Sequence, residues 1–312
     1  MKSMQLSGTK EHPTLVERDG PRPQPQAGQV LVRVHAAGIT PTELMWSPSW
    51  QTKNGEKRSG AVPSHEFSGE IVGMGKGVEG LSIGQEVYGM NDWYAEGALA
   101  EDCITQPDWI APKPRGLSHV EAATVPIGAL TALQGLFGRA KLQPGERVLV
   151  HGGAGGVGMF VVQLAHTLMA HVITTVSAHN VQFVKELGAD EVIDYKASRF
   201  DQQVRDVDVV FDAVGGETLE RSWGVLASNG RMVTIAADSE TADERTKQAF
   251  FIVEPRRPEL IEVAKMLDEW DLRTMVDAAV PWLQASDAYT GKVKRKGRGK
   301  MVVTVAKDLL AS

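Results

Sequence analysis

The sequence predicts an α/β protein of two domains, in which a β-rich, barrel-like domain is interrupted by a doubly wound parallel sheet. At about residue 125, short apolar runs broken by glycine and proline give way to apolar strands that alternate with helical patterns. Near the C-terminus the strand pattern returns. The 312 residues also exceed the roughly 250–300 residues at which a single core stops growing. We therefore expect residues 1–124 and 267–312 to form one domain and residues 125–266 the other.

The strands expected in the first domain are short apolar runs bounded by turn residues. They include residues 29–35, 69–73 and 85–88, and the last strand of the chain at 300–305. Runs of this length with frequent glycine and proline are typical of a twisted sheet that closes on itself. The C-terminal strand is expected to rejoin this sheet.

The second domain alternates strands with helices, as a parallel sheet requires, because parallel neighbours are joined by crossover helices. The expected strands are residues 147–151, 172–176, 191–194, 207–211 and 231–235. The expected helices are residues 157–170, 180–187, 197–206, 217–226 and 259–270. Gly188 follows the second of these helices, at the position where glycine commonly ends one.

Composition argues against several classes of protein. With 33 Lys and Arg against 39 Asp and Glu, the net charge is −6, which argues against a broad surface for nucleic acid or an anionic membrane. The single cysteine, Cys103, excludes an intramolecular disulfide and a multi-cysteine zinc site. Residues 1–10 contain no apolar signal segment, and polar residues interrupt the most apolar stretch, 157–176. These features predict a cytoplasmic protein without a membrane segment.

A glycine-rich loop carries the main functional signal. Gly153, Gly155 and Gly158 fit the pattern G-x-G-x-x-G, directly after an expected strand and at the start of an expected helix. In such a loop one glycine permits the tight turn, another lets the backbone approach a pyrophosphate, and the third lets the helix pack on the sheet. The helix N-terminus then favours the anion. We expect this loop to bind a dinucleotide rather than to be a merely structural turn.

The end of the second strand of this domain bears on which dinucleotide is bound. An NAD site usually has Asp or Glu about 20 residues after the motif, bonded to the ribose 2′-hydroxyl. Residues 176–180 contain no acid, so nothing there would repel a 2′-phosphate. Ser177 can donate a hydrogen bond to a phosphate, with His179 or Asn180 as further donors. No Arg or Lys stands at this turn, so the expectation of NADP(H) rests mainly on the absent acid.

The chain resembles the zinc-independent quinone oxidoreductases of the medium-chain dehydrogenase/reductase superfamily. The resemblance covers nearly the whole chain in the right order, and it implies a GroES-like β-barrel domain, a Rossmann domain and a cofactor in the cleft between them. It also implies a homodimer, with residues 250–253 as an edge strand. The stretches that carry it are residues 36–41, 63–69, 122–132, 148–158, 187–195, 211–216 and 299–303.

The resemblance implies a set of cofactor-binding residues. They are Thr131 on the nicotinamide side, Gly155, Gly156 and Val157 at the pyrophosphate, Ser177 and Tyr195 near the adenosine phosphate, and Val214, Ile235, Phe251 and Val253 along the path between. Two of them have structural alternatives. Tyr195 could instead cover the core at the end of a strand, and the hydroxyl of Thr131 could bond to its own helix.

The resemblance also bears on metal binding. The zinc-dependent relatives bind their catalytic metal with Cys, His and Cys, and these positions fall on Thr40, His65 and Ile127. Because a catalytic zinc needs three protein ligands and only the histidine remains, we expect no metal. His65 has two interpretations: a histidine hydrogen-bonded in the wall of the cleft, or a donor to a substrate oxygen. For Cys103 we expect a small, partly buried apolar side chain.

Without a Lewis acid, a simple alcohol is a poor hydride donor, whereas a conjugated acceptor needs less help. Hydride from NADPH can add to a quinone or to the β-carbon of an enone, and one or two hydrogen-bond donors then stabilise the negative oxygen. We expect Thr40 and His65 to be these donors. Trp46, Trp50 and Tyr94 are candidates for stacking on a flat substrate, with hydrophobic filling as the alternative.

Two other functions remain open from the sequence. One is a catalytically idle NADPH-binding protein that acts as a redox sensor or interaction module, because Thr40 stands where the quinone reductases tend to carry Asn. The other concerns residues 292–300, which contain six basic residues in nine. This run could bind RNA, an acidic partner or the 2′-phosphate, but the acidic chain favours a solvated turn.

Overall fold

A five-stranded, fully parallel sheet forms the centre of one lobe of the molecule. The computed structural model describes residues 1–236, 242–269 and 271–305. The strands are β8 (Arg147–His151), β9 (His171–Val176), β10 (Glu191–Asp194), β11 (Val207–Asp212) and β12 (Leu226–Thr234), in the spatial order β10-β9-β8-β11-β12. Because the order reverses between β8 and β11, the carboxyl ends of these two strands mark the point where such a sheet binds ligands.

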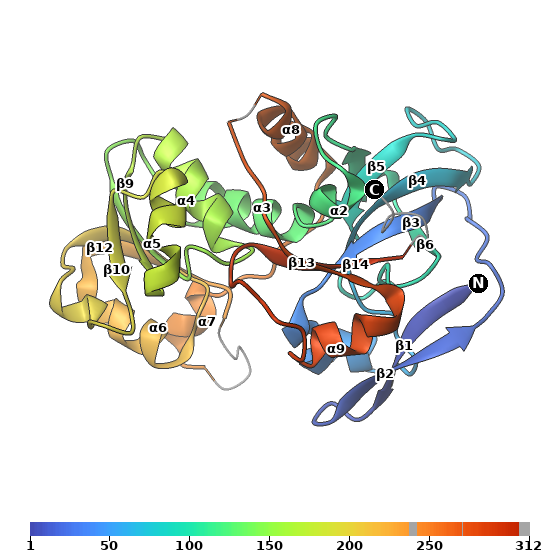
Figure 1. Ribbon diagram of the computed structural model, residues 1–312, viewed down its shortest axis with the longest axis horizontal. Helices are drawn as coiled ribbons and strands as arrows, with labels where there is room; N and C mark the ends of the chain where they lie inside the picture. The colour runs from blue at the N-terminus through green and yellow to red at the C-terminus, as the bar shows by residue number, and fades with distance from the viewer. Residues whose placement is uncertain (237–241, 270, 306–312) are drawn as a thin grey trace.

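Helices cover both faces of this sheet (Figure 1). The helices that contact its strands are α4 (Gly158–Thr167), α5 (Val181–Glu186), α6 (Gly216–Ser222) and α7 (Glu244–Ala249). Helix α3 (Pro126–Leu133) packs against α4, and α8 (Arg257–Asp268) packs against α3 and the other lobe. The expected alternation of strands and helices is confirmed. Trp270, where the last expected helix ends, lies outside the described residues.

One expected helix is wrong. Over residues 197–206 the structure has only a 3₁₀ turn, Phe200–Gln202. Phe200 and Val204 are the buried apolar side chains of this stretch, and its other residues are mostly charged or polar. One apolar pair is too little to offset the cost of starting a helix.

The other lobe is a curved, mainly antiparallel sheet with a hairpin beside it. The hairpin joins β1 (Lys2–Gly8) to β2 (Pro13–Asp19). The sheet contains β3 (Val30–Gly38), β4 (Glu66–Met74), β5 (Glu86–Met90), β6 (Asp102–Thr105), β7 (Ile110–Pro112), β13 (Val276–Pro281) and β14 (Lys300–Thr304). Strand β14 pairs antiparallel with β3, so the C-terminal strand returns to the N-terminal lobe as expected. The short helices of this lobe are α1 (Ser47–Trp50), α2 (His119–Ala122) and α9 (Ala285–Tyr289).

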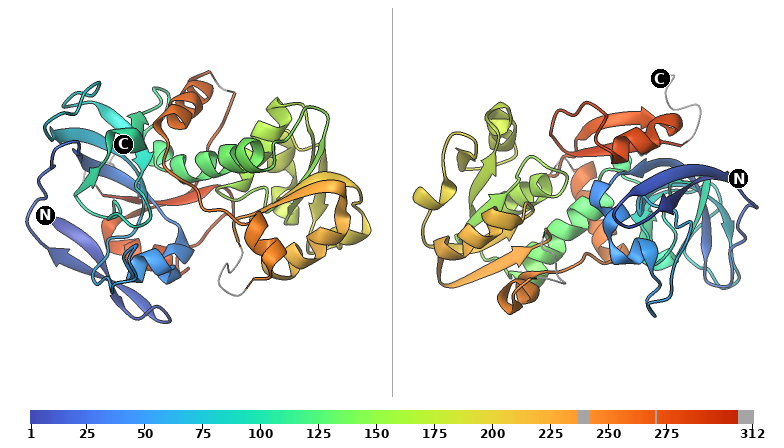
Figure 2. Two further views of the ribbon diagram at one scale, coloured as in Figure 1. Left: turned by 180° about the vertical axis from the view of Figure 1, so that it is seen from behind. Right: turned by 90° about the horizontal axis from the view of Figure 1, so that it is seen from below.

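Helix α3 lies between the two lobes, and every one of its residues is buried (Figure 2). The helical stretch His119–Arg139, which includes α2 and α3, has the length and apolar composition of a membrane span. However, 78% of its apolar window is buried inside the protein, as in the core helix of a globular protein. Across the junction, Tyr88 donates a hydrogen bond to the carbonyl of Leu260, and Trp93 donates one to that of Val253. The lobes are therefore joined by packing and by specific polar contacts.

Candidate functional site

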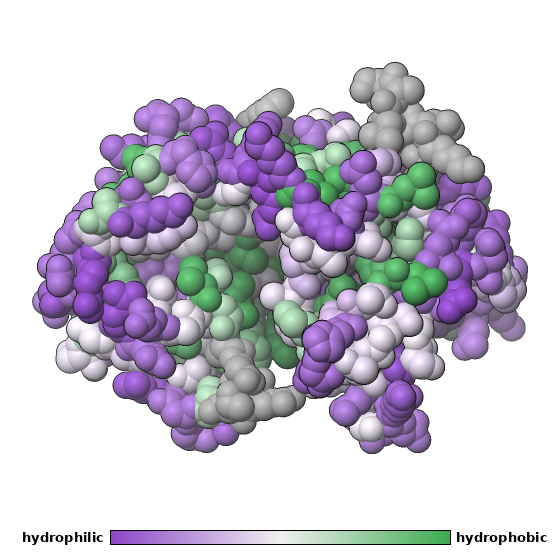
Figure 3. Space-filling model, turned by 60° about the horizontal axis from the view of Figure 1, so that its bottom comes forward, coloured by the Kyte–Doolittle hydropathy of each residue, from purple (hydrophilic) through white to green (hydrophobic). Residues whose placement is uncertain are grey.

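A cleft of about 2100 Å³ lies between the lobes and follows the carboxyl ends of the parallel strands. Figure 3 shows it as a hollow with hydrophobic surface at its base. Pockets for drug-sized ligands occupy about 300–1,000 Å³, so this cleft has room for a dinucleotide and a small substrate together. Residues of both lobes line it, and most of the residues expected from the sequence are among them.

The glycine loop joins β8 to α4 at one wall of the cleft. Gly152 has a φ of +78°, which allows the chain to turn sharply after the strand. A Cβ on Gly158 would lie 2.2 Å from the carbonyl oxygen of Gly152, so this glycine is needed for the loop to pack on the start of the helix. At Gly155 and Gly156 the nearest described atoms would be 3.3 and 3.5 Å away. These two glycines present open backbone to the cleft, where a Cβ would occupy space that a pyrophosphate needs.

Gly153 has a different role from the one expected. It is not among the described residues that line the cleft. A Cβ there would lie 2.1 Å from Oγ1 of Thr174, a fully buried side chain of β9. Gly153 is therefore required by packing against the neighbouring strand, whereas Ala154, Gly155, Gly156 and Val157 line the cleft.

At the adenosine end, the carboxyl ends of β9 and β10 bring Ser177 and Tyr195 to the cleft. Tyr195 is 57% exposed, so it does not cover the core as the structural alternative supposed. Val214, Ile235, Phe251 and Val253 also line the cleft, as the resemblance implied.

The basic run 292–300 also reaches the adenosine end, where the alternative of 2′-phosphate binding would place it. Arg295 lines the cleft and forms an ion pair with buried Asp277 at 2.7 Å. Arg298 donates hydrogen bonds to Oδ1 of Asn180 (2.8 Å) and to the carbonyl of His179 (2.7 Å). Residues 292 and 294–297 form an exposed turn, as expected, whereas Arg298 is half-buried and packs against the turn after β9. The six basic residues in nine were the available signal.

Thr131, on α3, lines the cleft, but its hydroxyl donates to the carbonyl of Ile127 at 2.6 Å. This is the local bond of the structural alternative, and it occupies the hydroxyl proton. Thr131 can therefore contact a ligand in the cleft and accept a hydrogen bond, but its hydroxyl is not free to donate one.

At the opposite end of the cleft, Thr40 lies just beyond β3. Within the described part of the chain, its buried Oγ1 has no hydrogen-bond partner. An unpartnered hydroxyl in a protein interior costs free energy, so its presence beside a cleft points to a partner that arrives with a ligand. Trp46, Trp93, Tyr94 and Ile127 surround this end.

Trp50 is not one of the described lining residues, contrary to the expectation for this aromatic. Its indole N–H donates to the carbonyl of Leu44 at 2.7 Å, and its ring packs against the core of its lobe. The hydrophobic alternative therefore describes Trp50, whereas Trp46 and Tyr94 do face the cleft.

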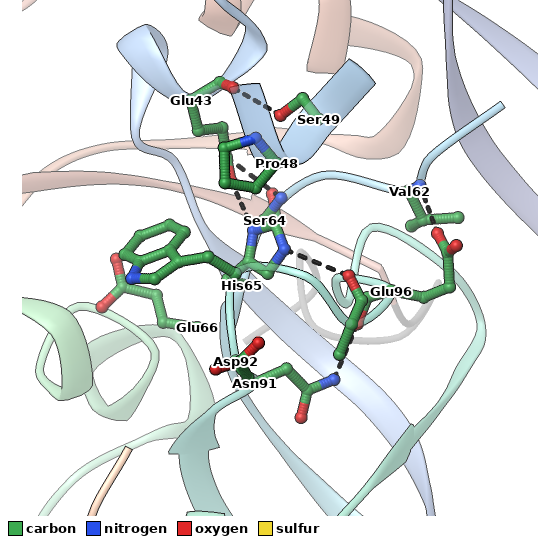
Figure 4. A network of polar contacts seen from close by, with 12 residues as sticks. Glu43, Pro48, Ser49, Val62, Ser64, His65, Glu66, Asn91, Asp92 and Glu96 are labelled. Atoms are coloured by element: carbon green, nitrogen blue, oxygen red, sulfur yellow. Dashed lines mark hydrogen bonds and ion pairs between the residues drawn. The ribbon is translucent and has the colours of Figure 1, made fainter. Parts of the chain in front are cut away.

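His65 is placed as a structural histidine rather than as a substrate donor. It is 4% exposed and is not among the described residues that line the cleft. Its Nδ1 lies 2.7 Å from a carboxylate oxygen of Glu43 (Figure 4). Its Nε2 lies 3.4 Å from the carbonyl oxygen of Ala95. The other carboxylate oxygen of Glu43 accepts hydrogen bonds from the hydroxyl of Tyr289 and the backbone of Ser64. Because both ring nitrogens face protein oxygens, the expectation that His65 donates to a substrate is wrong.

A buried ion pair at this end of the cleft was also missed. Lys300, the first residue of β14, lines the cleft and forms an ion pair with Glu66 of β4. The second carboxylate oxygen of Glu66 accepts the backbone N–H of Ile127 at the start of α3, at 2.9 Å. In Figure 4 the carboxylate of Glu66 is directed away from the pair of His65 and Glu43. Nothing in the local sequence indicates this pair, because 234 positions separate its members.

The residues at this place do not fit a zinc ion. Thr40 and Ile127 occupy two of the three ligand positions, and the imidazole of His65 is bonded to protein oxygens. Across residues 1–236, 242–269 and 271–305, no group of three or more His, Cys, Asp or Glu side chains could bind a metal. Cys103 is buried in β6, where burial raises the pKa of its thiol.

Comparison with known proteins assigns the family. Residues 26–115 match the family described as alcohol dehydrogenase GroES-like domain, and residues 187–303 match the family described as zinc-binding dehydrogenase. The chain is 30% identical to a probable zinc-binding oxidoreductase, mitochondrial, of Arthroderma benhamiae, over 94% of this chain and 93% of that one. This chain belongs to the medium-chain dehydrogenase/reductase superfamily.

Other members of the superfamily extend the comparison. The chloroplast envelope quinone oxidoreductase homolog of Arabidopsis thaliana is 28% identical over 91% of this chain and 92% of its own. The solved quinone oxidoreductase of Coxiella burnetii has a TM-score of 0.86 and 31% identity, covering 98% of this chain and 99% of its own. The family and fold expected from the sequence are confirmed, and the chain is an oxidoreductase with a nicotinamide cofactor.

The expected cytoplasmic location is contradicted by the same comparison. Two of the similar relatives are named as a mitochondrial protein and a chloroplast envelope protein. Composition and the polar character of residues 1–10 do not separate these compartments, because a protein imported into an organelle folds in water with the same kind of core and surface.

Proposed function

We propose that this oxidoreductase uses NADPH to transfer a hydride to a quinone or an α,β-unsaturated carbonyl, without a metal ion. One observation carries the proposal. One cleft joins the open glycines, Gly155 and Gly156, to a substrate end where, among the described residues, the hydroxyl of Thr40 has no partner and no set of zinc ligands is present.

The preference for NADPH over NADH rests on the charges at the adenosine end. Lys196, Arg199 and Arg295 line the cleft near Ser177 and Tyr195. A 2′-phosphate there would be held by these cations and by the hydroxyls of Ser177 and Tyr195. Residues 176–180 contain no acid that would repel it.

Bound NADPH would supply the hydride, and the side chains of the chain would provide orientation and charge stabilisation. Thr40 would donate a hydrogen bond to the carbonyl oxygen as negative charge develops there, because its hydroxyl has no described partner to give up. The rings of Trp46 and Tyr94 would stack on a flat conjugated acceptor and exclude water from the reacting atoms. Ile127 and Trp93 would complete the apolar walls.

We also infer that the protein is a homodimer joined at the outer edge of the parallel sheet. Strand β12 is at the end of the strand order, and beyond it only Phe250 forms a single parallel bridge, to Thr234, among the described residues. Ile252, two residues on, is 56% exposed and also lines the cleft. An open edge with an exposed apolar residue can pair with a second chain, and light scattering on the purified protein tests this.

The test of the catalytic proposal is NADPH oxidation by purified protein against a panel of quinones and enones, with NADH and simple alcohols as controls. Zinc is measured on the same preparation. We expect turnover with quinones or enones, no stoichiometric zinc and no loss of activity after chelation. Activity only with NAD and alcohols, or stoichiometric zinc, would refute it. Tight NADPH binding without reduction of any acceptor would instead support the idle redox sensor.

A further inference from the structure

We propose that Lys300 is the proton donor of the reaction, held at the substrate end of the cleft by Glu66 and placed beside Thr40. This inference rests on the proposed reductase function, which requires a proton as well as a hydride.

The sheet register brings Lys300 and Thr40 together. Strands β14 and β3 pair antiparallel with Val302 opposite Gly38, and the backbone N–H of Ile39 donates to the carbonyl of Met301 at 2.9 Å. Continuing this register by two residues on each strand places Lys300 opposite Thr40. Paired residues of an antiparallel sheet point to the same face. Both residues line the cleft, so the ammonium-bearing side chain and the unpartnered hydroxyl are neighbours at one place.

The ion pair with Glu66 that positions the ammonium group of Lys300 is possible because residue 38 is a glycine. Gly38 of β3 lies opposite Glu66 of β4, in the continuation of the register in which Ala37 faces Phe67. A Cβ on Gly38 would lie 2.5 Å from Cγ and 2.6 Å from Oε1 of Glu66. Because this glycine has no side chain, the carboxylate of Glu66 can cross over β3 and reach Lys300.

The position of Glu66 also ties the ion pair to the cofactor end. Its other oxygen accepts the N–H of Ile127, in the first turn of the helix that carries Thr131. On the other side, a Cβ on Gly156 would lie 3.5 Å from Cβ of Lys300. The stem of Lys300 therefore runs beside the open part of the glycine loop, and the ion pair lies between the expected cofactor and Thr40.

Several charged groups surround Lys300. Burial lowers its pKa to about 7, and the negative charge of Glu43 acts in the opposite direction. A lysine with such a pKa exchanges a proton at neutral pH, whereas an ordinary lysine holds it. The elements packed around it carry further titratable groups: Glu43 with its partners His65 and Tyr289, Glu66, Asp277 with its partner Arg295, His119 and Glu121 of α2, Arg33 and His35 of β3, and Asp287 of α9.

For an enone, one hydride and one proton together reduce the carbon–carbon double bond. The hydride forms a new C–H bond at the β-carbon, and the π electrons move to the carbonyl oxygen, which accepts a hydrogen bond from Thr40. An N–H bond of the Lys300 ammonium then breaks, and its proton goes to the enolate. Lys300 is left neutral and takes a proton from solvent before the next turnover. For a quinone, the same proton goes to a hydroquinone oxygen.

The decisive experiment compares the pH dependence of kcat/KM for the wild type, K300M and K300R. A general acid works only when protonated, so we expect the wild-type kcat/KM to be level at low pH and to fall as the pH rises above about 7. Because general acid catalysis contributes about 10²–10⁴-fold, K300M should lose roughly that factor and show no alkaline fall. Arginine keeps the positive charge but does not release its proton, so K300R should match the wild type in melting temperature and still lack activity. K265M, on the exposed face of α8, is the control that should leave kcat/KM unchanged.

A second variant tests the role of Glu66. E66Q removes the negative charge beside Lys300, so the pKa of Lys300 should fall and the alkaline limb of the pH profile should move to lower pH. A purely structural ion pair would change the melting temperature without moving this limb.

A readout that needs no turnover completes the test. NMR of protein labelled with ¹³C at the lysine ε-carbon, with the Lys300 signal assigned by its absence in K300R, should show titration near neutral pH. Titration in the ordinary range of lysine, or a K300R variant as active as the wild type, would overturn the proposal. A wild type that reduces no acceptor would refute the proposed reductase function, and the proton-donor role would fall with it.

Discussion

Substitution by alanine should have different effects at two glycines of the cofactor loop. It should lower the stability of the fold at Gly153 and weaken NADPH binding at Gly155. In G153A the new methyl group would lie 2.1 Å from Oγ1 and 3.1 Å from Cβ of Thr174, which is fully buried and donates to the carbonyl of Val150 at 2.8 Å. In G155A the methyl group would meet, within the described part of the chain, only the carbonyl oxygen of Gly152, at 3.3 Å. The first change strains the fold, whereas the second fills the space expected for the pyrophosphate.

The magnitudes follow from these contacts. Overpacking of a dense core costs about 1–3 kcal/mol, which lowers the melting temperature by roughly 2–12 °C in a domain of this size. G153A should show this loss, and the T174A change, which removes the clashing hydroxyl, should reduce it. G155A should unfold within about 0.5 kcal/mol of the wild type. If its methyl group costs one hydrogen bond to a charged phosphate, worth about 1.5–3 kcal/mol, the NADPH Kd should rise roughly 10- to 150-fold.

The assay is thermal unfolding by circular dichroism together with NADPH titration followed by intrinsic tryptophan fluorescence. A double-mutant cycle of G153A and T174A gives the coupling free energy between the two sites. The reasoning would be refuted if G153A were as stable as the wild type, or if G155A bound NADPH with unchanged affinity.

Three further predictions use other parts of the structure. R295Q should weaken NADPH by about tenfold or more and leave NADH nearly unchanged, because one phosphate contact is removed; equal effects on both cofactors in parallel titrations would contradict this. T40V should lower kcat/KM by roughly 10²-fold with an unchanged NADPH Kd, and a variant as active as the wild type would exclude Thr40 as the donor. Burial lowers the pKa of His119 to about 4 and that of His151 to about 3, so the folded state binds fewer protons than the unfolded state below about pH 6.5. The melting temperature should therefore fall as the pH drops from about 6.5 towards 3, and H119Q should lessen the fall.

Much of the fold could be predicted because its signals are local. The alternation of apolar strands and helices after residue 125 reflects burial on both faces of a parallel sheet, and it is readable segment by segment. The signal of the glycine loop is also local, since the turn, the open backbone at Gly155 and Gly156, and the start of the helix all lie within residues 152–158. The helix expected over residues 197–206 failed because its polar positions outnumber the apolar pair that could anchor it.

The substrate end was harder to predict because its chemistry is made by distant partners. His65 looked available in the sequence, but Glu43, 22 positions away, occupies its ring. Lys300 looked like part of a solvated basic run, but β14 buries it against Glu66. Glu43 reaches His65 from the 3₁₀ turn after β3. The pair of Lys300 and Glu66 follows only from the register between β14, β3 and β4, and register depends on the whole sheet.

The contact between the glycine loop and the C-terminal strand has a consequence for synthesis. Gly299 donates its N–H to the carbonyl of Ala154 and forms a parallel bridge with Gly155, so the last strand braces the loop. Arg295 reaches the other end of the same cleft. A chain that is still being translated already contains the parallel sheet and its glycine loop, yet it lacks the brace until residue 300 has emerged from the ribosome. Cofactor binding should therefore depend on β14, and chains that stop before this strand should bind NADPH more weakly.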